Sequence, residues 1–199
     1  MDDRIQTVLD LYHARIAEER ERPMSADDRD ERLLAVGPET GQLINIIARG
    51  YQAPNILEIG TSYGYSGIWL ADAARATGGR LTTLELQDYK SAYARDMAEK
   101  AGLAAHIDFQ VGDALELIAA YPSGIDFVLL DLWKDLYTPC LEAFYPKLNP
   151  GAIIVADNIL RPAPGPGIES YVQAVRAKPG MRSLLLPVGT GIEVSRFEP

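Results

Sequence analysis

The sequence has little cysteine, little histidine and a deficit of positive charge. Its one cysteine, Cys140, cannot form an internal disulfide. With only two histidines in addition, the sequence has no cluster of the ligands that zinc prefers. The 28 acidic residues outnumber the 19 lysines and arginines, which gives a formal net charge of −9. A surface that neutralises many phosphates needs clustered basic residues. We therefore expect a small-molecule ligand and no nucleic-acid partner.

Long apolar runs and a basic, apolar leader are also missing. The longest apolar runs have the length of a β-strand, far below the roughly 20 residues that cross a bilayer. The first ten residues, MDDRIQTVLD, lack the pattern of a signal peptide. These features predict a cytoplasmic protein without a membrane partner. A length of 199 residues, of which 47% are hydrophobic, suits one domain with a substantial core.

The residue pattern predicts an α/β fold. Residues 1–22 and 39–50 have the spacing of helices, and Pro23 should end the first one. From residue 55 onward, short aliphatic runs alternate with helical segments, which is typical of parallel strands with crossover helices. The predicted strands read NILEIG, RLTTLEL, HIDFQVG, IDFVLLD and GAIIVADN, and the later helices span 66–76, 89–101, 114–120, 135–147 and 168–177. The segment MRSLLLPVGTGIEVSRF predicts an antiparallel hairpin with a tight Gly-Thr-Gly turn.

Polar residues gather at the carboxyl ends of the predicted strands, where open α/β sheets bind their ligands. These positions are Glu58, Gly60, Glu85, Gly112, Asp113, Asp131, Asp157 and Asn158. A simpler interpretation is that Asp131 or Asp135 caps the helix that follows. Because the ADN of residues 156–158 ends a second aliphatic run in the same way, we favour a ligand site.

The segment EIGTSYGYSG, residues 58–67, predicts a strand, a glycine-rich turn and a helix whose N–H groups approach a ligand. It lacks the G-x-G-x-x-G spacing that seats a pyrophosphate. Glu58 before the turn would repel a pyrophosphate and would suit a cationic or amino-bearing ligand. Glu85, after the next strand, is placed to accept hydrogen bonds from ribose hydroxyls. A ribose without a pyrophosphate, beside a positive charge, describes S-adenosylmethionine.

Seven segments run in order through most of residues 30–199: VGPETGQ, ILEIGTSYGYS, LTTLEL, GDALE, DLWKDLY, VADNIL and GIEVSR. In this order and spacing the sequence resembles the small cation-dependent O-methyltransferases of the catechol and caffeoyl-CoA type. The resemblance implies a Rossmann-like class I methyltransferase fold, with a mostly parallel seven-stranded sheet, a C-terminal antiparallel hairpin and helices on both faces. It also implies a single domain over residues 1–199, in which residues 1–50 form the lid on the acceptor side and residues 55–199 form the cofactor-binding core.

The same resemblance implies roles for individual residues. Asp131, Asp157 and Asn158 would bind the metal ion, and Lys134 would be the general base. The residues implied for the cofactor are Val36, Glu58, Gly60, Thr61, Ser66, Glu85, Asp113, Ala114, Asp131 and Trp133. Arg32 replaces an aromatic gatekeeper and Leu184 replaces a glutamate that holds the second hydroxyl of the acceptor, so the acceptor itself is not inherited. Met24 and Tyr63 are candidates for the acceptor pocket.

Two carboxylates and an amide form an oxygen-only site that suits Mg²⁺, or Mn²⁺ or Ca²⁺. Such an ion would bind two adjacent phenolic hydroxyls and lower their pKa, and Lys134 would take the proton. We therefore expect a cation-dependent O-methyltransferase that acts on a small catechol-like aromatic acceptor. The apolar stripe of the first helix packs on its own domain or contacts a second subunit in a homodimer.

Two alternatives stay open. The first is a methyltransferase of the same fold whose acceptor is an amine or a carboxylate, and cation dependence would separate it from the leading hypothesis. The second is an adenosyl-nucleoside binding protein without catalysis, which would bind the cofactor and transfer no methyl group. An NAD-dependent reductase is disfavoured because the third glycine and an evident Tyr-x-x-x-Lys pair are missing.

Overall fold

The computed structural model describes residues 2–22, 29–161 and 165–199, and two predictions, for Pro23 and Met24, lie outside these ranges. Within them the helices are α1 (Asp3–Glu21), α2 (Pro38–Ala48), α3 (Tyr65–Thr77), α4 (Asp88–Lys100), α5 (Ala114–Ala120), α6 (Tyr137–Phe144) and α7 (Pro166–Ala177). The strands are β1 (Asn55–Ile59), β2 (Arg80–Glu85), β3 (Ile107–Val111), β4 (Ile125–Leu130), β5 (Leu148–Ala156), β6 (Met181–Leu186) and β7 (Ile192–Phe197). Short 3₁₀ turns span Arg29–Glu31, Ala104–His106, Lys134–Leu136 and Tyr145–Lys147.

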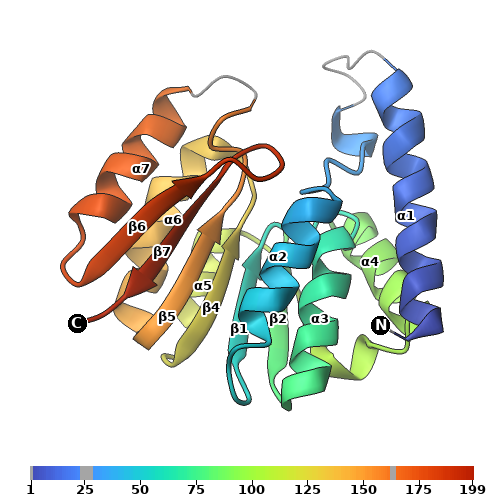
Figure 1. The fold of residues 1–199 in the computed structure, drawn as a ribbon, viewed down its shortest axis with the longest axis horizontal. Coiled ribbons are helices and arrows are strands. Elements are labelled where there is room, and N and C mark those ends of the chain that lie inside the picture. Colours follow the sequence, from blue (N-terminus) through green and yellow to red (C-terminus); the bar gives the residue numbers. More distant parts are fainter. Residues whose placement is uncertain (1, 23–28, 162–164) are drawn as a thin grey trace.

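The strands form one seven-stranded sheet in the order β3-β2-β1-β4-β5-β7-β6. Strands β1 to β5 run parallel, whereas β7 lies antiparallel between β5 and β6. The mostly parallel sheet and the terminal hairpin predicted from the sequence are therefore confirmed. The strand order reverses between β1 and β4, and ligands of such sheets bind at that switch point. All five parallel strands carry their carboxyl ends to the same edge (Figure 1).

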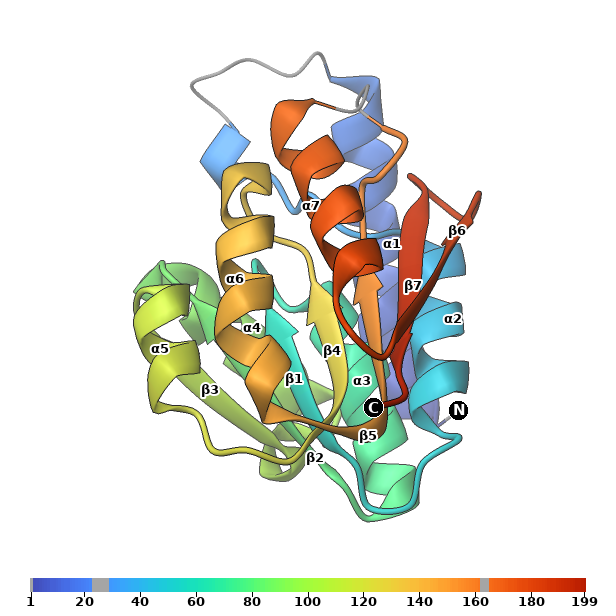
Figure 2. The same ribbon diagram turned by 90° about the vertical axis from the view of Figure 1, so that its left-hand side faces the viewer.

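Helices cover both faces of the sheet, as the two views of the ribbon show (Figures 1 and 2). Alternating strand residues face opposite sides, so β4 sends Phe127 and Leu129 into the core beneath α1 to α4. Its residues Val128 and Leu130 enter the second core beneath α5 to α7. Burial on both faces explains why the strands read as continuous aliphatic runs. No helix in the described part of the chain is long and apolar enough to cross a membrane.

The predicted helix over residues 135–147 is wrong as a single element. The chain instead forms a 3₁₀ turn at Lys134–Leu136, the helix α6 and a second 3₁₀ turn at Tyr145–Lys147. Pro146 has no backbone N–H, so the α-helical hydrogen-bond pattern cannot pass through it. The other predicted helices are present, with ends that differ by one or two residues.

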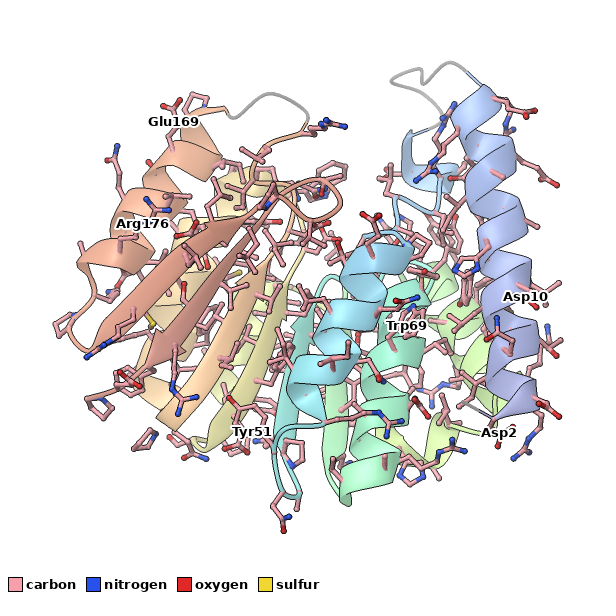
Figure 3. All side chains as sticks on the ribbon, in the orientation of Figure 1. Asp2, Asp10, Tyr51, Trp69, Glu169 and Arg176 are labelled. Carbon is pink, nitrogen blue, oxygen red and sulfur yellow. The ribbon has the colours of Figure 1, made fainter. Side chains whose placement is uncertain are left out.

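The helices α2 and α3 pack closely because one of them carries a glycine at the contact. A Cβ on Gly41 would lie 2.4 Å from the indole nitrogen of Trp69. Trp69, labelled in Figure 3, lies where the two helices meet and is buried. Asn45 of α2 also donates to the backbone oxygen of Trp69. This contact fixes α2, and with it the segment before α2, over the sheet edge.

The first helix is held over the glycine-rich turn. The Tyr12 hydroxyl donates to the backbone oxygen of Tyr63 at 2.6 Å, inside the core. At the C-terminal end of α1, the Arg32 guanidinium donates to the backbone oxygens of Glu19 and Arg22. Arg32, predicted to replace an aromatic gatekeeper, is 7% exposed and stabilises the carbonyl end of α1. Helix α1 is therefore tied to neighbouring segments at its middle and at its C-terminal end.

Candidate active site

The turn after β1 requires glycine where it meets the end of β4. Gly60 has φ +106°, and a Cβ at this position would lie 2.0 Å from the backbone oxygen of Asp131. No other residue fits this close approach of two strand ends. The N–H groups of Gly60 and Thr61 both donate to the oxygen of Leu84, each at 3.0 Å. The turn thus places the start of α3 directly beside the loop that follows β4.

Glu58 lies fully buried beneath this turn, with 0% of its surface exposed. Its Oε2 accepts a hydrogen bond from the Thr83 hydroxyl at 2.6 Å, and Ser66 is a second hydrogen-bond partner. Its Oε1 has no hydrogen-bond partner among the described residues. Burial raises the pKa of Glu58 to about 7, although the bonds from Ser66 and Thr83 act in the opposite direction. An unsatisfied buried carboxylate oxygen is suited to a ligand that carries a donor or a positive charge.

Thr61 lies in the same network, since its hydroxyl is hydrogen-bonded to that of Thr83. The carboxylate of Glu85 accepts from the backbone N–H of Ser62 at 2.7 Å and from that of Gln87 at 3.0 Å. Glu85 thereby links the end of β2 to the glycine-rich turn. The Ser62 hydroxyl donates in turn to the oxygen of Leu33, in the segment that leads to Val36. These predicted cofactor residues therefore converge on one turn.

The remaining predicted cofactor residues lie farther along the same sheet edge. Asp113 caps α5, because its Oδ1 accepts from the N–H groups of Leu115 and Glu116 at 2.9 and 3.1 Å. Ala114 is the first residue of that helix. The indole of Trp133 is 43% exposed, and Leu86 and Val111 are also exposed at the ends of β2 and β3. Exposed large apolar residues after β2, β3 and β4, at the same edge of the sheet, provide surfaces on which a flat heterocycle can pack.

A lysine joins the ends of β4 and β5. The Lys134 ammonium donates to Asp131 Oδ1 at 3.2 Å and to Asn158 Oδ1 at 2.5 Å. It also donates to the Tyr137 hydroxyl at 2.7 Å, and that hydroxyl donates to the backbone oxygen of Asp157 at 3.1 Å. Asn158 has φ +57°, an uncommon conformation outside glycine that turns its amide toward this group. The structure therefore brings Asp131, Lys134 and Asn158 together, as predicted.

Asp157 lies directly after β5, next to Asn158, and is the buried member of the group formed with Asp131, Lys134 and Asn158. It is 0% exposed, and its Oδ1 accepts from the Thr190 hydroxyl at 2.8 Å. Its Oδ2 has no hydrogen-bond partner among the described residues. Burial, and next the negative charge of Asp131, raises the pKa of Asp157 to about 7. In the described part of the chain, no three His, Cys, Asp or Glu side chains form a metal cluster, and the third oxygen-bearing side chain at this position is the amide of Asn158.

The structure does not support the interpretation that Asp131 or Asp135 caps the helix that follows. Neither the 3₁₀ turn at Lys134–Leu136 nor α6 has a side-chain hydrogen bond at its N-terminus. Asp131 instead accepts from Lys134, and Asp135 is exposed. The acidic residues that end β4 and β5 are therefore available to a ligand site and do not serve to start a helix.

A cavity of about 260 Å³ opens beside this group. Its walls come from Lys134, Asp135 and Asn158 on one side and from residues 165–168, at the N-terminus of α7, on the other. A Cβ on Gly167 would lie 2.6 Å from the backbone oxygen of Lys134, so α7 packs directly against the lysine backbone. The volume suits a small organic molecule. Tyr63, the other predicted pocket residue, lies elsewhere, against Arg15, Tyr89 and Tyr93.

The sequence interpretation missed two residues of the site, Tyr137 and Thr190. A signal for Tyr137 was present, since residues three apart share one face of a helical turn and Tyr137 follows Lys134 by three. Thr190 gave no comparable signal, because Gly-Thr-Gly is typical of any tight turn. Leu184 was singled out in the same hairpin, yet it is exposed in the middle of β6 and pairs with Val194.

A family model described as a methyltransferase domain matches residues 57–159, more than half of the chain. The chain therefore belongs to this methyltransferase family. A catechol O-methyltransferase of Niastella koreensis is 35% identical over an alignment of 132 positions, and the match covers 64% of this chain and 59% of that protein. A caffeoyl-CoA O-methyltransferase of Petroselinum crispum is 28% identical over an alignment of 187 positions, and the match covers 82% of this chain and 77% of that protein. The matched part thus spans less than two thirds of the length of the Niastella protein.

The O-methyltransferase from Bacillus cereus, solved in complex with SAH, has the same fold. Its TM-score is 0.79 at 27% sequence identity, and the match covers 100% of this chain and 92% of that chain. The comparisons confirm the resemblance drawn from the motifs and the Rossmann-like methyltransferase fold. The roles of the individual site residues, a cytoplasmic location and a homodimer stay predictions.

Proposed function

We propose that the chain is an S-adenosylmethionine-dependent O-methyltransferase that requires a divalent cation and methylates an aromatic acceptor with two adjacent hydroxyls. The family, the catechol and caffeoyl-CoA relatives and the Bacillus cereus structure support methyl transfer to oxygen. One observation carries the finer proposal. The Lys134 ammonium lies between oxygens of Asp131 and Asn158, and the 260 Å³ cavity opens beside it.

The oxygen atoms at this position fit a hard cation. Asp131 Oδ1 and Asn158 Oδ1 already accept from a positive charge. Asp157 Oδ2 is buried and has no partner in the described part of the chain, and burying such an oxygen is costly unless something pairs with it. Two carboxylates and an amide oxygen are ligands of Mg²⁺, Mn²⁺ or Ca²⁺. Asp131, Asp157 and Asn158 would therefore hold the cation.

The cofactor would lie between the glycine-rich turn and the ends of β2 to β4. Glu58, below the turn, offers one unpaired carboxylate oxygen, and Glu85 offers acceptor oxygens to ribose hydroxyls. Gly60 lets the ligand and the backbone approach closely, and Trp133 offers an exposed indole for stacking. The bound cofactor supplies an electrophilic methyl group, and the cation supplies positive charge that favours the phenolate.

Lys134 would remove the acceptor proton. Its ammonium is the basic group nearest to both Asp131 and Asn158, and it lines the cavity. In the proposed complex the ammonium would lose its proton to solvent beside the cation, and the neutral amine would then take the proton of the hydroxyl that is methylated. Gly167 and Ile168, across the cavity, would exclude water and hold the ring in place.

A panel of acceptors tests the proposal. Catechol is compared with resorcinol and phenol, which lack a second hydroxyl on the adjacent carbon, and methylated products are measured by mass spectrometry. We expect turnover of catechol-type acceptors alone, complete loss in excess chelator, and recovery when Mg²⁺ is restored. Full turnover in chelator would refute cation dependence and favour the alternative with another acceptor. Cofactor binding without transfer to any acceptor would favour the non-catalytic alternative.

A further inference from the structure

The turn between β6 and β7 brings Thr190 to the carboxyl end of β5, because β7 pairs antiparallel with β5. The backbone oxygen of Thr190 accepts from the N–H groups of Leu160 and Arg161, each at 3.0 Å. Gly191 has φ +86°, and a Cβ there would lie 2.5 Å from the Leu160 side chain. Backbone contacts therefore fix the turn against the segment after β5 and leave the Thr190 hydroxyl for another use.

The hydrogen bonds through that hydroxyl have a single possible direction. An ammonium group can only donate, so the Asn158 atom that faces Lys134 at 2.5 Å must be the amide oxygen. The amide nitrogen then faces Thr190 and donates to its hydroxyl oxygen at 3.0 Å. The hydroxyl in turn donates to Asp157 Oδ1 at 2.8 Å. One hydroxyl thus accepts from one of the three proposed metal ligands, Asn158, and donates to a second, Asp157.

We propose that Thr190 is a positioning residue for the divalent cation, an inference that rests on the cation site of the proposed function. By accepting from the Asn158 amide nitrogen, it holds the amide oxygen toward the cation. By donating to Asp157 Oδ1, it leaves Oδ2 as the atom that binds. Without the hydroxyl, the Asn158 amide nitrogen loses its acceptor and only the contact with Lys134 orients the amide, so the amide oxygen is held less firmly toward the cation.

The decisive experiment measures cation binding directly. Mn²⁺ is titrated into the purified chain and the free ion is followed by electron paramagnetic resonance. Thr190→Val keeps the shape of the side chain and removes the hydroxyl, so its Kd for Mn²⁺ should rise by roughly 10- to 100-fold, the usual effect of losing a group that orients metal ligands. Thr190→Ser keeps the hydroxyl and should restore binding to within a few-fold of the wild type.

The matched control is Thr138→Val, since the Thr138 hydroxyl is buried without a hydrogen-bond partner in the described part of the chain. This variant should bind Mn²⁺ like the wild type. Affinity for S-adenosylhomocysteine should be equal in all variants and reports correct folding. Thr190→Ala provides the same comparison with less apolar bulk if the valine variant does not fold.

Several results would overturn the inference. Wild-type affinity in Thr190→Val, or an equal loss in Thr190→Ser, would show that the hydroxyl does not orient the ligands. A wild-type chain that binds no Mn²⁺ would overturn it as well, even if methyl transfer is observed. If Mn²⁺ binds and the variants behave as expected but no acceptor is methylated, the inference stands and the proposed reaction fails.

Discussion

Glu58 should make the stability of the ligand-free chain depend on pH, and Glu58→Gln should remove that dependence. The carboxyl group is fully buried, one of its oxygens has no partner in the described structure, and burial raises its pKa from 4.5 to about 7. In the unfolded chain the same group ionises near its ordinary value. Between pH 4.5 and pH 7, the folded chain therefore binds more protons than the unfolded chain.

The sign follows from this difference in bound protons. The free energy of unfolding falls as pH rises from about 4.5 to about 7, and the full loss is present above pH 7. The difference between the two pKa values corresponds to about 3 kcal/mol, as an order of magnitude. A glutamine does not ionise, so Glu58→Gln avoids this loss, although it gives up part of the hydrogen bonding to Thr83 and Ser66 at about 1 kcal/mol for each bond.

Urea denaturation of the ligand-free wild type and of Glu58→Gln, at pH values from 5 to 8.5, measures the effect. We expect the glutamine variant to gain about 3 kcal/mol relative to the wild type across that range, so that it is the more stable protein at pH 8. Asp157 also has a raised pKa, but it is present in both proteins and its contribution cancels in the comparison. A stability difference that stays constant over the range would refute the reasoning.

Thr83→Val tests the cause of the shift. The Thr83 hydroxyl donates to Glu58 and lowers its pKa, so removing the hydroxyl should move the pH-dependent loss of stability to higher pH.

Measurements with cofactor present test whether Glu58 also binds it. Glu58→Gln should bind S-adenosylmethionine more weakly than the wild type, while being more stable without it at pH 8. Unchanged affinity would show that Glu58 has no role in binding.

Three further substitutions test the other proposed roles. Glu85→Ala should weaken S-adenosylmethionine binding by roughly 1.5–3 kcal/mol in calorimetry, the value of hydrogen bonds to a charged acceptor, and unchanged affinity would remove Glu85 from the site. Lys134→Met should keep cofactor affinity and lower kcat by roughly 10²- to 10⁴-fold, less for acceptors of lower phenolic pKa, whereas normal turnover of every acceptor would refute the general base. Tyr137→Phe removes a hydroxyl 2.7 Å from the Lys134 ammonium, so it should lower kcat at an unchanged KM for cofactor and cause no further loss in the Lys134→Met background. Additive losses in the double variant would show that Tyr137 acts independently of the lysine.

The fold could be predicted from the sequence because its strands are buried on both faces. The runs at 55–59 and 125–130 are mostly apolar and mostly buried, and polar residues follow each run. Parallel strands carry those polar ends to one edge, so Asp131 and Asn158 were expected to lie close together. In the structure both accept a hydrogen bond from Lys134. Periodicity was a poorer guide where proline intervened, as at Pro146.

The contribution of Thr190 could not be predicted in this way. Its position depends on β7 lying antiparallel beside β5, which places the hairpin turn over the carboxyl end of β5. It depends further on Gly191, whose missing side chain lets the turn contact Leu160. Both are tertiary contacts between segments far apart in the chain. Local pattern identifies the turn but carries no information about what the turn touches.

Two carboxylate oxygens in the described structure break the rule that buried polar atoms are hydrogen-bonded, Oε1 of Glu58 and Oδ2 of Asp157. They belong to the two buried carboxylates whose pKa burial raises to about 7. A chain selected for stability alone would neutralise or pair such groups, since each is unfavourable to folding once ionised. Each lies at the carboxyl end of a parallel strand, one beside the glycine-rich turn and one beside Lys134. Positive charge on a bound sulfonium cofactor and on a divalent cation would satisfy them in turn, so the same two carboxylates that weaken the ligand-free fold would account for the affinity of the proposed site.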